Sequence, residues 1–332
     1  MREAEIDWTA RADEALSILE RVRAGVGAVV LGQERVVEQT LCALLAGGHG
    51  LLVGAPGLAK TLLVETLAVS FGLEWRRIQF TPDLMPADII GAEVLEEGED
   101  RRRRFRFIPG PVFTSLLMAD EINRASPRTQ SALLQAMQER HVTVAGVRHD
   151  LPAPFHVFAT QNPIEQEGAY PLPEAQLDRF LLQIDVPYPD AETERRILIA
   201  TTGAGALRPA AAATAHELAR VQDLVRRMPV GETVLDAILR LVRAARPEPG
   251  GRRDVAEAVS WGPGPRAGQA LSLAARARAL LRGRLAPSLD DVAALARPAL
   301  VHRLGLSWSA RADGVRPEAL VDAIAAEALA PA

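Results

Sequence analysis

Lysine is nearly absent from this 332-residue sequence: Lys60 is the only one, and the other 37 basic residues are arginines. A compact ammonium group therefore occurs at a single position, whereas planar guanidinium groups occur along the whole chain. Cysteine is equally scarce. Because Cys42 has no second cysteine to pair with, an intrachain disulfide is excluded, and its apolar neighbours indicate a buried core residue rather than a reactive thiol. We expect a reducing, cytoplasmic location.

Long apolar segments and an excess of positive charge are also missing. The first residues carry acidic side chains where an export signal would carry basic ones, so we expect no export by that route. The uncharged run 41–59 is interrupted by glycines, and we expect no membrane insertion. The formal net charge of −4 gives no support to nucleic-acid binding. The length and composition predict one large globular domain followed by a smaller one.

The segment 54–61 has the residues of a phosphate-binding loop between an apolar strand and an apolar helix, although a plain turn can have the same pattern. Its glycines allow the backbone amides to surround an anion at the positive end of the helix. We expect Lys60 to reach the β- and γ-phosphates of a bound nucleotide and the Thr61 hydroxyl to hold Mg²⁺. Ala59 stands where the general pattern has glycine, and we expect helical backbone angles there. The predicted binding set is Gly54, Ala55, Pro56, Gly57, Leu58, Ala59, Lys60, Thr61 and Leu62.

Two further predicted strands end in polar side chains. Residues 114–121 are predicted to form a short apolar strand that ends in Asp120 and Glu121. We expect Asp120 to act at Mg²⁺, directly or through water, and Glu121 to act as general base on the attacking water, although polar residues commonly end a strand. The run 155–161 is followed by Asn162, which either forms a turn before Pro163 or, if its strand lies beside that of Asp120, orients water and senses the γ-phosphate.

Three residues outside these motifs are further candidates. Gly32 separates two predicted helices, either as a turn residue or as a backbone contact with adenine. Arg179 either pairs with Asp178 or reaches the nucleotide of a neighbouring subunit, as an arginine does in many ring ATPases. Arg266 lies in the first turn of a predicted helix, where the helix dipole disfavours a cation, so we expect an anion such as phosphate beside it, with a plain surface arginine as the alternative.

A change in pattern near residue 189 divides the chain. Residues 1–189 are predicted to form a nucleotide-binding core, with hairpins at about 91–110 and about 140–152. Residues 190–332 are predicted to form a helical lid, because helical apolar spacing recurs there (192–201, 216–227, 233–246, 267–282, 288–304 and 317–329). The run from Arg101 to Arg106 lies opposite acidic residues, which favours a solvated hairpin over one that contacts a substrate.

In combination these motifs resemble the MoxR group of AAA+ ATPases, in the branch with an insert in its second helix. The matching stretches are 54–61, 81–91, 110–113, 117–125, 129–140, 159–168, 170–180 and 265–267. The resemblance implies an α/β fold, with a five-stranded parallel sheet between helices and a C-terminal helical lid. It also implies site roles: Lys60 and Thr61 as Walker A, Asp120 and Glu121 as Walker B, Asn162 as sensor 1, Arg179 as arginine finger, and Arg266 as sensor 2 in its own subunit or the next.

The same resemblance implies a Mg²⁺-dependent ATPase that works as a homo-oligomeric ring, a hexamer. Such proteins look like chaperones that remodel, mature or assist metal loading of a client protein, together with a partner that carries a von Willebrand factor A domain. Two alternatives stay open. One is a nucleic-acid motor related to the helicases of the same branch, and the other is a nucleotide-gated scaffold without turnover.

Overall fold

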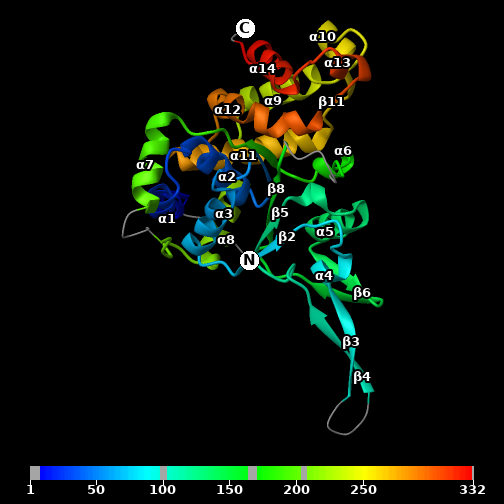
Figure 1. Cartoon of the computed structure of the whole chain (residues 1–332). Coiled ribbons are helices and arrows are strands. Elements are labelled where there is room, and N and C mark those ends of the chain that lie inside the picture. The colour runs from blue at the N-terminus through cyan, green and yellow to red at the C-terminus, as the bar shows by residue number, and fades with distance from the viewer. Residues whose placement is uncertain (1–7, 98–102, 164–169, 203–207, 331–332) are drawn as a thin grey trace, which may run out of the picture.

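A five-stranded parallel sheet organises the first half of the chain in the computed structural model, which describes residues 8–97, 103–163, 170–202 and 208–330 (Figure 1). The strand order is β2-β5-β8-β1-β9, and every pairing is parallel. The predicted sheet is confirmed, as is the pairing of the Asp120 strand with the strand before Asn162. The strands are β1 (Gly50–Val53), β2 (Trp75–Gln79), β5 (Leu116–Asp120), β8 (His156–Gln161) and β9 (Leu182–Asp185).

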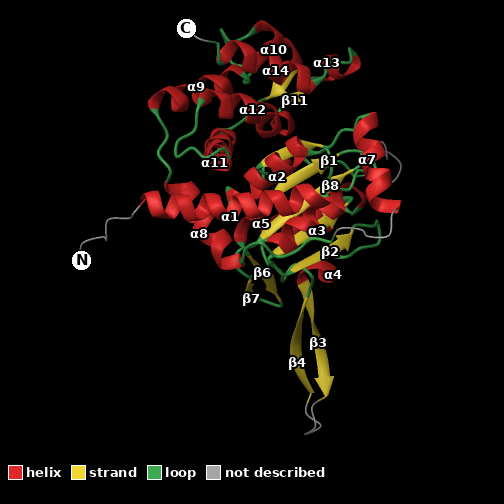
Figure 2. Cartoon of the chain, turned by 90° about the vertical axis from the view of Figure 1, so that its left-hand side faces the viewer, coloured by secondary structure: helices red, strands yellow, loops and turns green. Residues whose placement is uncertain are grey.

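Helices cover both faces of this sheet (Figure 2). Alternate residues of β5 enter different hydrophobic clusters: Met118 packs with α1 (Trp8–Val29), α2 (Glu34–Leu45) and α3 (Lys60–Ser70), whereas Leu117 packs with α4 (Pro86–Ile90) and α5 (Pro127–Glu139). Successive side chains of a strand point to opposite faces. The buried central strands are therefore apolar over residues 116–119 and 157–159, with polar residues at their ends.

Two antiparallel hairpins leave the sheet. The longer pairs β3 (Gly91–Glu97) with β4 (Arg103–Pro109) and projects away from the rest of the chain (Figure 2). Arg106 forms an ion pair with Glu96 at 3.3 Å, so this hairpin partly neutralises its own charge. The shorter pairs β6 (His141–Val144) with β7 (Val147–Asp150). Residues 98–102 of the predicted hairpin, including Arg101, lie outside the described residues, as do residues 164–168 of the matching stretch 159–168 and residues 203–207.

The second half of the chain is almost entirely helical. The six predicted helices appear, although the one expected to reach residue 304 ends at Leu300, and two short helices and a two-stranded ladder were not predicted. Among the described residues no helix is long and apolar enough to cross a membrane. The elements are α7 (Ala191–Thr202), α8 (Ala215–Arg227), α9 (Glu232–Ala244), α10 (Arg253–Ala258), β10 (Val259–Trp261), α11 (Pro265–Leu281), α12 (Leu289–Leu300), η2 (Val301–Arg303), β11 (Gly305–Leu306), α13 (Trp308–Ala312) and α14 (Pro317–Ala328).

The two halves share one hydrophobic cluster. Val221 and Leu224 of α8 are buried with Val22 of α1, and α11 packs against α2. Gly32 lies against Thr193 of α7, where a Cβ would come within 2.1 Å of Thr193 Cγ2. Gly32 also has a φ of +66°, a backbone conformation that favours glycine and is compatible with a turn.

Two neutral histidines are buried where β1 and β8 begin. The Nδ1 of His49 accepts a hydrogen bond from the Val157 amide at 2.9 Å, and His156 donates from Nδ1 to the Gly48 carbonyl at 2.9 Å. The Nε2 of His156 lies 3.0 Å from Gln222 Nε2 of α8, from which it accepts. Burial lowers the pKa of His49 to about 3 and the pKa of His156 to about 4.

We predict that acid destabilises the fold through these histidines. In the unfolded chain they titrate near pH 6.5, so below that pH the unfolded state binds more protons than the folded state. Each histidine should then lower the free energy of unfolding by up to about 1.4 kcal/mol per pH unit until its folded-state pKa is reached. Urea unfolding at pH 7, 6 and 5 measures this loss. The variant His156→Gln should show a shallower pH dependence, and an unchanged slope would contradict the assignment.

Candidate active site

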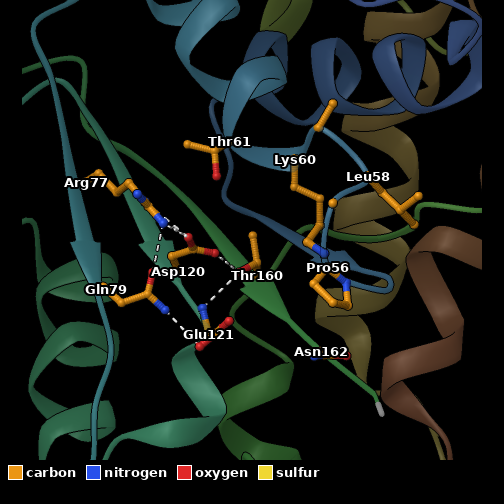
Figure 3. Close-up of a pocket in the computed structure, with 12 residues that line it drawn as sticks. Pro56, Leu58, Lys60, Thr61, Arg77, Gln79, Asp120, Glu121, Thr160 and Asn162 are labelled. Atoms are coloured by element: carbon orange, nitrogen blue, oxygen red, sulfur yellow. Dashed lines mark hydrogen bonds and ion pairs between the residues drawn. The ribbon is translucent and has the colours of Figure 1, made fainter. Parts of the chain in front are cut away.

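A cavity of about 400 Å³ opens where β1, β2, β5 and β8 end (Figure 3). The carboxyl ends of parallel strands meet at one edge of a sheet, which is where α/β proteins bind ligands. Polar groups from the predicted loop and from three strands converge there. The cavity is lined by Pro56, Gly57, Leu58, Ala59, Lys60, Thr61, Arg77, Gln79, Asp120, Glu121, Thr160 and Asn162.

The predicted phosphate-binding loop forms one wall of this cavity. Lys60 Nζ donates to the carbonyls of Gly54 and Ala55, both at 2.7 Å, so these two residues orient the lysine. Desolvation lowers the pKa of Lys60, and the charges of Asp120 and Glu121 oppose this shift. Gly54 is obligatory, because a Cβ there would lie 2.6 Å from the Val186 carbonyl oxygen. Of the predicted loop residues, Pro56 to Thr61 line the cavity.

The expected helical angles at Ala59 are wrong. Ala59 has φ 56° and ψ 21°, in the left-handed region, and its carbonyl accepts the first helical bond from Leu63 at 2.9 Å. The loop must reverse direction immediately before α3 begins at Lys60, and a left-handed residue makes that reversal. For an L-residue with a Cβ this conformation costs about 1 kcal/mol, so the surrounding loop imposes it.

The two adjacent carboxylates are both anchored at the cavity (Figure 3). Asp120 Oδ2 accepts from Arg77 Nη2 at 2.6 Å and Nε at 3.1 Å, and its Oδ1 accepts from Thr160 Oγ1 at 2.5 Å. Glu121, with a left-handed φ of 55°, turns away from the strand direction. Its Oε2 accepts from Gln79 Nε2 at 2.8 Å and from Arg124 Nη1 at 2.9 Å.

Sequence reasoning missed Arg77, Gln79 and Thr160. Arg77 and Gln79 lie two residues apart on β2 and therefore share a face, and Gln79 is in register with Asp120. Thr160 binds the Asp120 carboxylate and also accepts a hydrogen bond from the Glu121 amide at 2.8 Å. The available signal was the alternation of polar residues at Arg77 and Gln79 in a predicted strand. Which groups these side chains contact depends on which strand lies beside β2.

The chemistry of these groups fits a nucleoside triphosphate with Mg²⁺. Lys60 and the loop amides suit phosphate oxygens, and the Thr61 hydroxyl and the Asp120 carboxylate are oxygen ligands of the kind Mg²⁺ prefers. Within the described part of the chain, no cluster of three or more His, Cys, Asp or Glu side chains could hold a metal by itself.

Arg179 and Arg266 do not line this cavity but share another, of about 360 Å³. Asp178 does not hold Arg179: its carboxylate pairs with Arg303 at 2.7 Å and with Arg266 at 3.7 Å. The Arg179 guanidinium makes no hydrogen bond or ion pair with any residue that the structure describes. Both predicted arginines therefore lie together, outside the nucleotide cavity of their own chain.

Gly32 and Leu62 also lie outside the first cavity. Gly32 borders a third cavity of about 250 Å³, together with Gln33 and Tyr188, and Gln33 Nε2 donates to the Leu58 carbonyl at 3.3 Å. This contact joins the Gly32 turn to the phosphate loop. Leu62 is 37% exposed on α3. The contact of Gly32 with adenine stays a prediction.

Comparison with known proteins identifies the family of this chain. Over 92% of this chain and 80% of its own length, "Chaperone MoxR1" of Mycobacterium tuberculosis is 45% identical to it. The chain belongs to the MoxR family of AAA+ ATPases. "Protein MoxR" of Paracoccus denitrificans is 33% identical over 98% of both chains.

Domain and structure comparisons agree with the MoxR assignment. The family profile "ATPase family associated with various cellular activities (AAA)" matches residues 49–182, and the profile "AAA lid domain" matches residues 252–324. A crystal structure of an ATPase candidate from Cytophaga hutchinsonii covers 95% of each chain with a TM-score of 0.87 and 36% identity. The predicted family and fold are confirmed.

For this MoxR-family chain we predict that Lys60→Ala lowers ATP affinity on the order of 10- to 100-fold, because it removes charge-assisted hydrogen bonds to phosphate. Lys60→Arg is the matched control: it keeps the charge, but its planar fork should not fit among the phosphates and should restore little affinity. Titration with a fluorescent ATP analogue measures both variants, with thermal unfolding as the test of folding. Affinity equal to wild type in Lys60→Ala would refute the role of the loop.

Proposed function

We propose that this protein hydrolyses ATP with Mg²⁺ and uses the energy to remodel a client protein. The observation that carries the proposal is that Lys60, Thr61, Asp120, Glu121 and Asn162 all line one cavity. Lys60 and Thr61 would hold the triphosphate and its metal, with Asp120 as the acidic partner of Mg²⁺. The ion would neutralise charge on the phosphates.

Glu121 is the proposed general base. Its carboxylate is held at Oε2 by Gln79 and Arg124, which leaves Oε1 to accept a proton from water. Asn162 is 5% exposed on the cavity wall beyond β8, and its amide is proposed to orient that water. These groups make a scaffold without turnover the weaker reading of the site.

The variant Glu121→Gln should bind ATP with nearly wild-type affinity but lower turnover by about 100-fold or more, because the amide cannot take a proton. Phosphate release measures turnover, and a fluorescent nucleotide measures affinity. Asp88→Asn is a suitable control, since Asp88 caps α4 outside the cavity and should leave turnover unchanged. Equal turnover by wild type and the Glu121 variant would end the assignment.

The proposed working form is a homo-oligomeric ring, a hexamer, with ATP between subunits. Support comes from Arg179 and Arg266, which share a cavity apart from the nucleotide cavity of their own chain. We propose that both act across the interface, on the nucleotide of the next subunit. A guanidinium in this position stabilises the charge that develops on the transferred phosphoryl group.

In an assembly made only of Arg179→Ala subunits, turnover should therefore fall by about 1,000-fold, while nucleotide affinity stays unchanged. Mixed with Glu121→Gln subunits, which keep Arg179, the Arg179→Ala subunits should recover turnover, because each defect lies on a different side of the interface. The measurement is phosphate release against mixing ratio. Normal hydrolysis by pure Arg179→Ala would show that Arg179 is not the finger.

The proposed biological role is that of a cytoplasmic chaperone that remodels, matures or assists metal loading of a client, with a von Willebrand factor A domain protein as partner. Support comes from the MoxR relatives and from the projecting β3–β4 hairpin, where Leu95 and Phe105 are 48% and 71% exposed. Leu95 and Phe105 are cross-strand neighbours in this hairpin, and contiguous exposed apolar side chains can mark a surface that binds protein. A nucleic-acid motor is not favoured, because the hairpin pairs Arg106 with Glu96. The Glu121→Gln variant with bound ATP should capture a client protein, which mass spectrometry would identify. DNA binding that weakens with added salt would instead support the nucleic-acid motor.

A further inference from the structure

A buried arginine from the second half of the chain holds the segment that carries Arg179. Arg303 ends η2, and only 1% of its side chain is exposed. Its guanidinium reaches residues 178–181, which join α6 (Glu174–Leu177) to β9. Nε donates to Asp178 Oδ1 at 2.7 Å, Nη2 donates to the carbonyls of Phe180 at 2.7 Å and Asp178 at 3.2 Å, and Nη1 donates to those of Leu181 at 3.2 Å and Ala299.

These contacts fix the backbone on both sides of Arg179. The carbonyls of Asp178 and Phe180 both accept from Arg303, and His302 donates from Nε2 to the Phe180 carbonyl at 3.1 Å. The Arg179 guanidinium itself has no partner among the described residues. Within the described ranges, the segment thus combines a side chain that has no polar partner with a backbone whose carbonyls are held by hydrogen bonds.

We call the contacts of Arg303 with residues 178–181 the clamp. Arg266, the second arginine proposed to act at the interface, also contacts this segment. Arg266, at the start of α11, lies 3.7 Å from the other carboxylate oxygen of Asp178. Asp178, which directly precedes Arg179, therefore contacts two arginines from the second half of the chain. The segment that carries Arg179 is therefore held both by α11 and η2 and, through the Leu181 amide and the His49 carbonyl at 2.8 Å, by the start of β1.

We propose that Arg303, acting through Asp178 and the neighbouring carbonyls, is a positioning residue for Arg179 in hydrolysis by the next subunit. The inference rests on the proposed function, in which Arg179 is the finger. Arg303 belongs to the second half of the chain. The proposal therefore links the position of that half to the orientation of Arg179. The strand edge that holds the nucleotide in the same subunit is not part of this clamp.

Only arginine can make this clamp. Its guanidinium presents five N–H groups in a fixed plane, and all five positions are used here. Lysine keeps the positive charge but has three donors on a compact ammonium group. Arg303→Lys therefore preserves a cation beside Asp178 while releasing backbone carbonyls around Arg179.

The test compares Arg303→Lys, Arg179→Ala and the double variant in the full chain. Arg303→Lys should lower turnover at least about 10-fold, while fluorescent-nucleotide affinity changes less than about 3-fold. The double variant should turn over no more slowly than Arg179→Ala alone, because Arg303 acts only through the finger. Arg284→Met is the matched control: it removes another second-half arginine, paired with Asp291 at 2.7 Å, and should not reproduce this pattern.

Each other outcome is decisive. If pure Arg179→Ala hydrolyses normally, the finger of the proposed function fails. If Arg179→Ala is inactive but Arg303→Lys is within about 2-fold of wild type, or if the two losses multiply in the double variant, the positioning role alone is overturned. If thermal unfolding shows that Arg303→Lys does not fold, Asp178→Asn replaces it in the same comparison. Failure of both variants to fold would assign the clamp to stability and overturn the proposal.

Discussion

Parallel pairing of four strands is the constraint on which the site depends. Because β1, β2, β5 and β8 run in one direction, their carboxyl ends deliver the loop, Asp120, Glu121 and Asn162 to one edge. The central strands are buried on both faces, so a shift of register would expose apolar side chains and misplace the acids. The apolar core and the arrangement of the proposed catalytic groups therefore have the same physical origin.

Two of the four non-glycine residues with positive φ in the described part of the chain lie at this edge. Ala59 and Glu121 both have positive φ values without being glycine, and both line the cavity. One lets the loop turn into α3, and the other turns the proposed base away from the direction of β5. Each costs about 1 kcal/mol or more, which is large against a typical net stability of about 5–15 kcal/mol. The buried cluster around the sheet keeps these conformations populated.

The predicted site residues lie in two separate cavities, which we propose to be two parts of one site shared between subunits. One cavity holds the groups for phosphate and metal, and the other holds Arg179, Arg266 and the clamp around Asp178. A subunit of the proposed ring would complete the site of its neighbour. The buried Arg303 contact also links the helical second half to the segment beside β9, so the helical half helps to shape the proposed interface.

The strands of the parallel sheet, the predicted phosphate loop, the paired acids and the long helices could be predicted from the sequence, because they depend on local periodicity and on residue types at fixed spacing. The family could be predicted as well, through several motifs in combination. The β10–β11 ladder, the contacts of Arg77, Gln79 and Thr160 with the acids, the left-handed Ala59 and the pairing of Arg303 with Asp178 required the folded structure. Arg77 and Asp120 are 43 residues apart, and Arg303 and Asp178 are 125 apart. Contacts over such separations follow from strand order and domain packing, which no local pattern encodes.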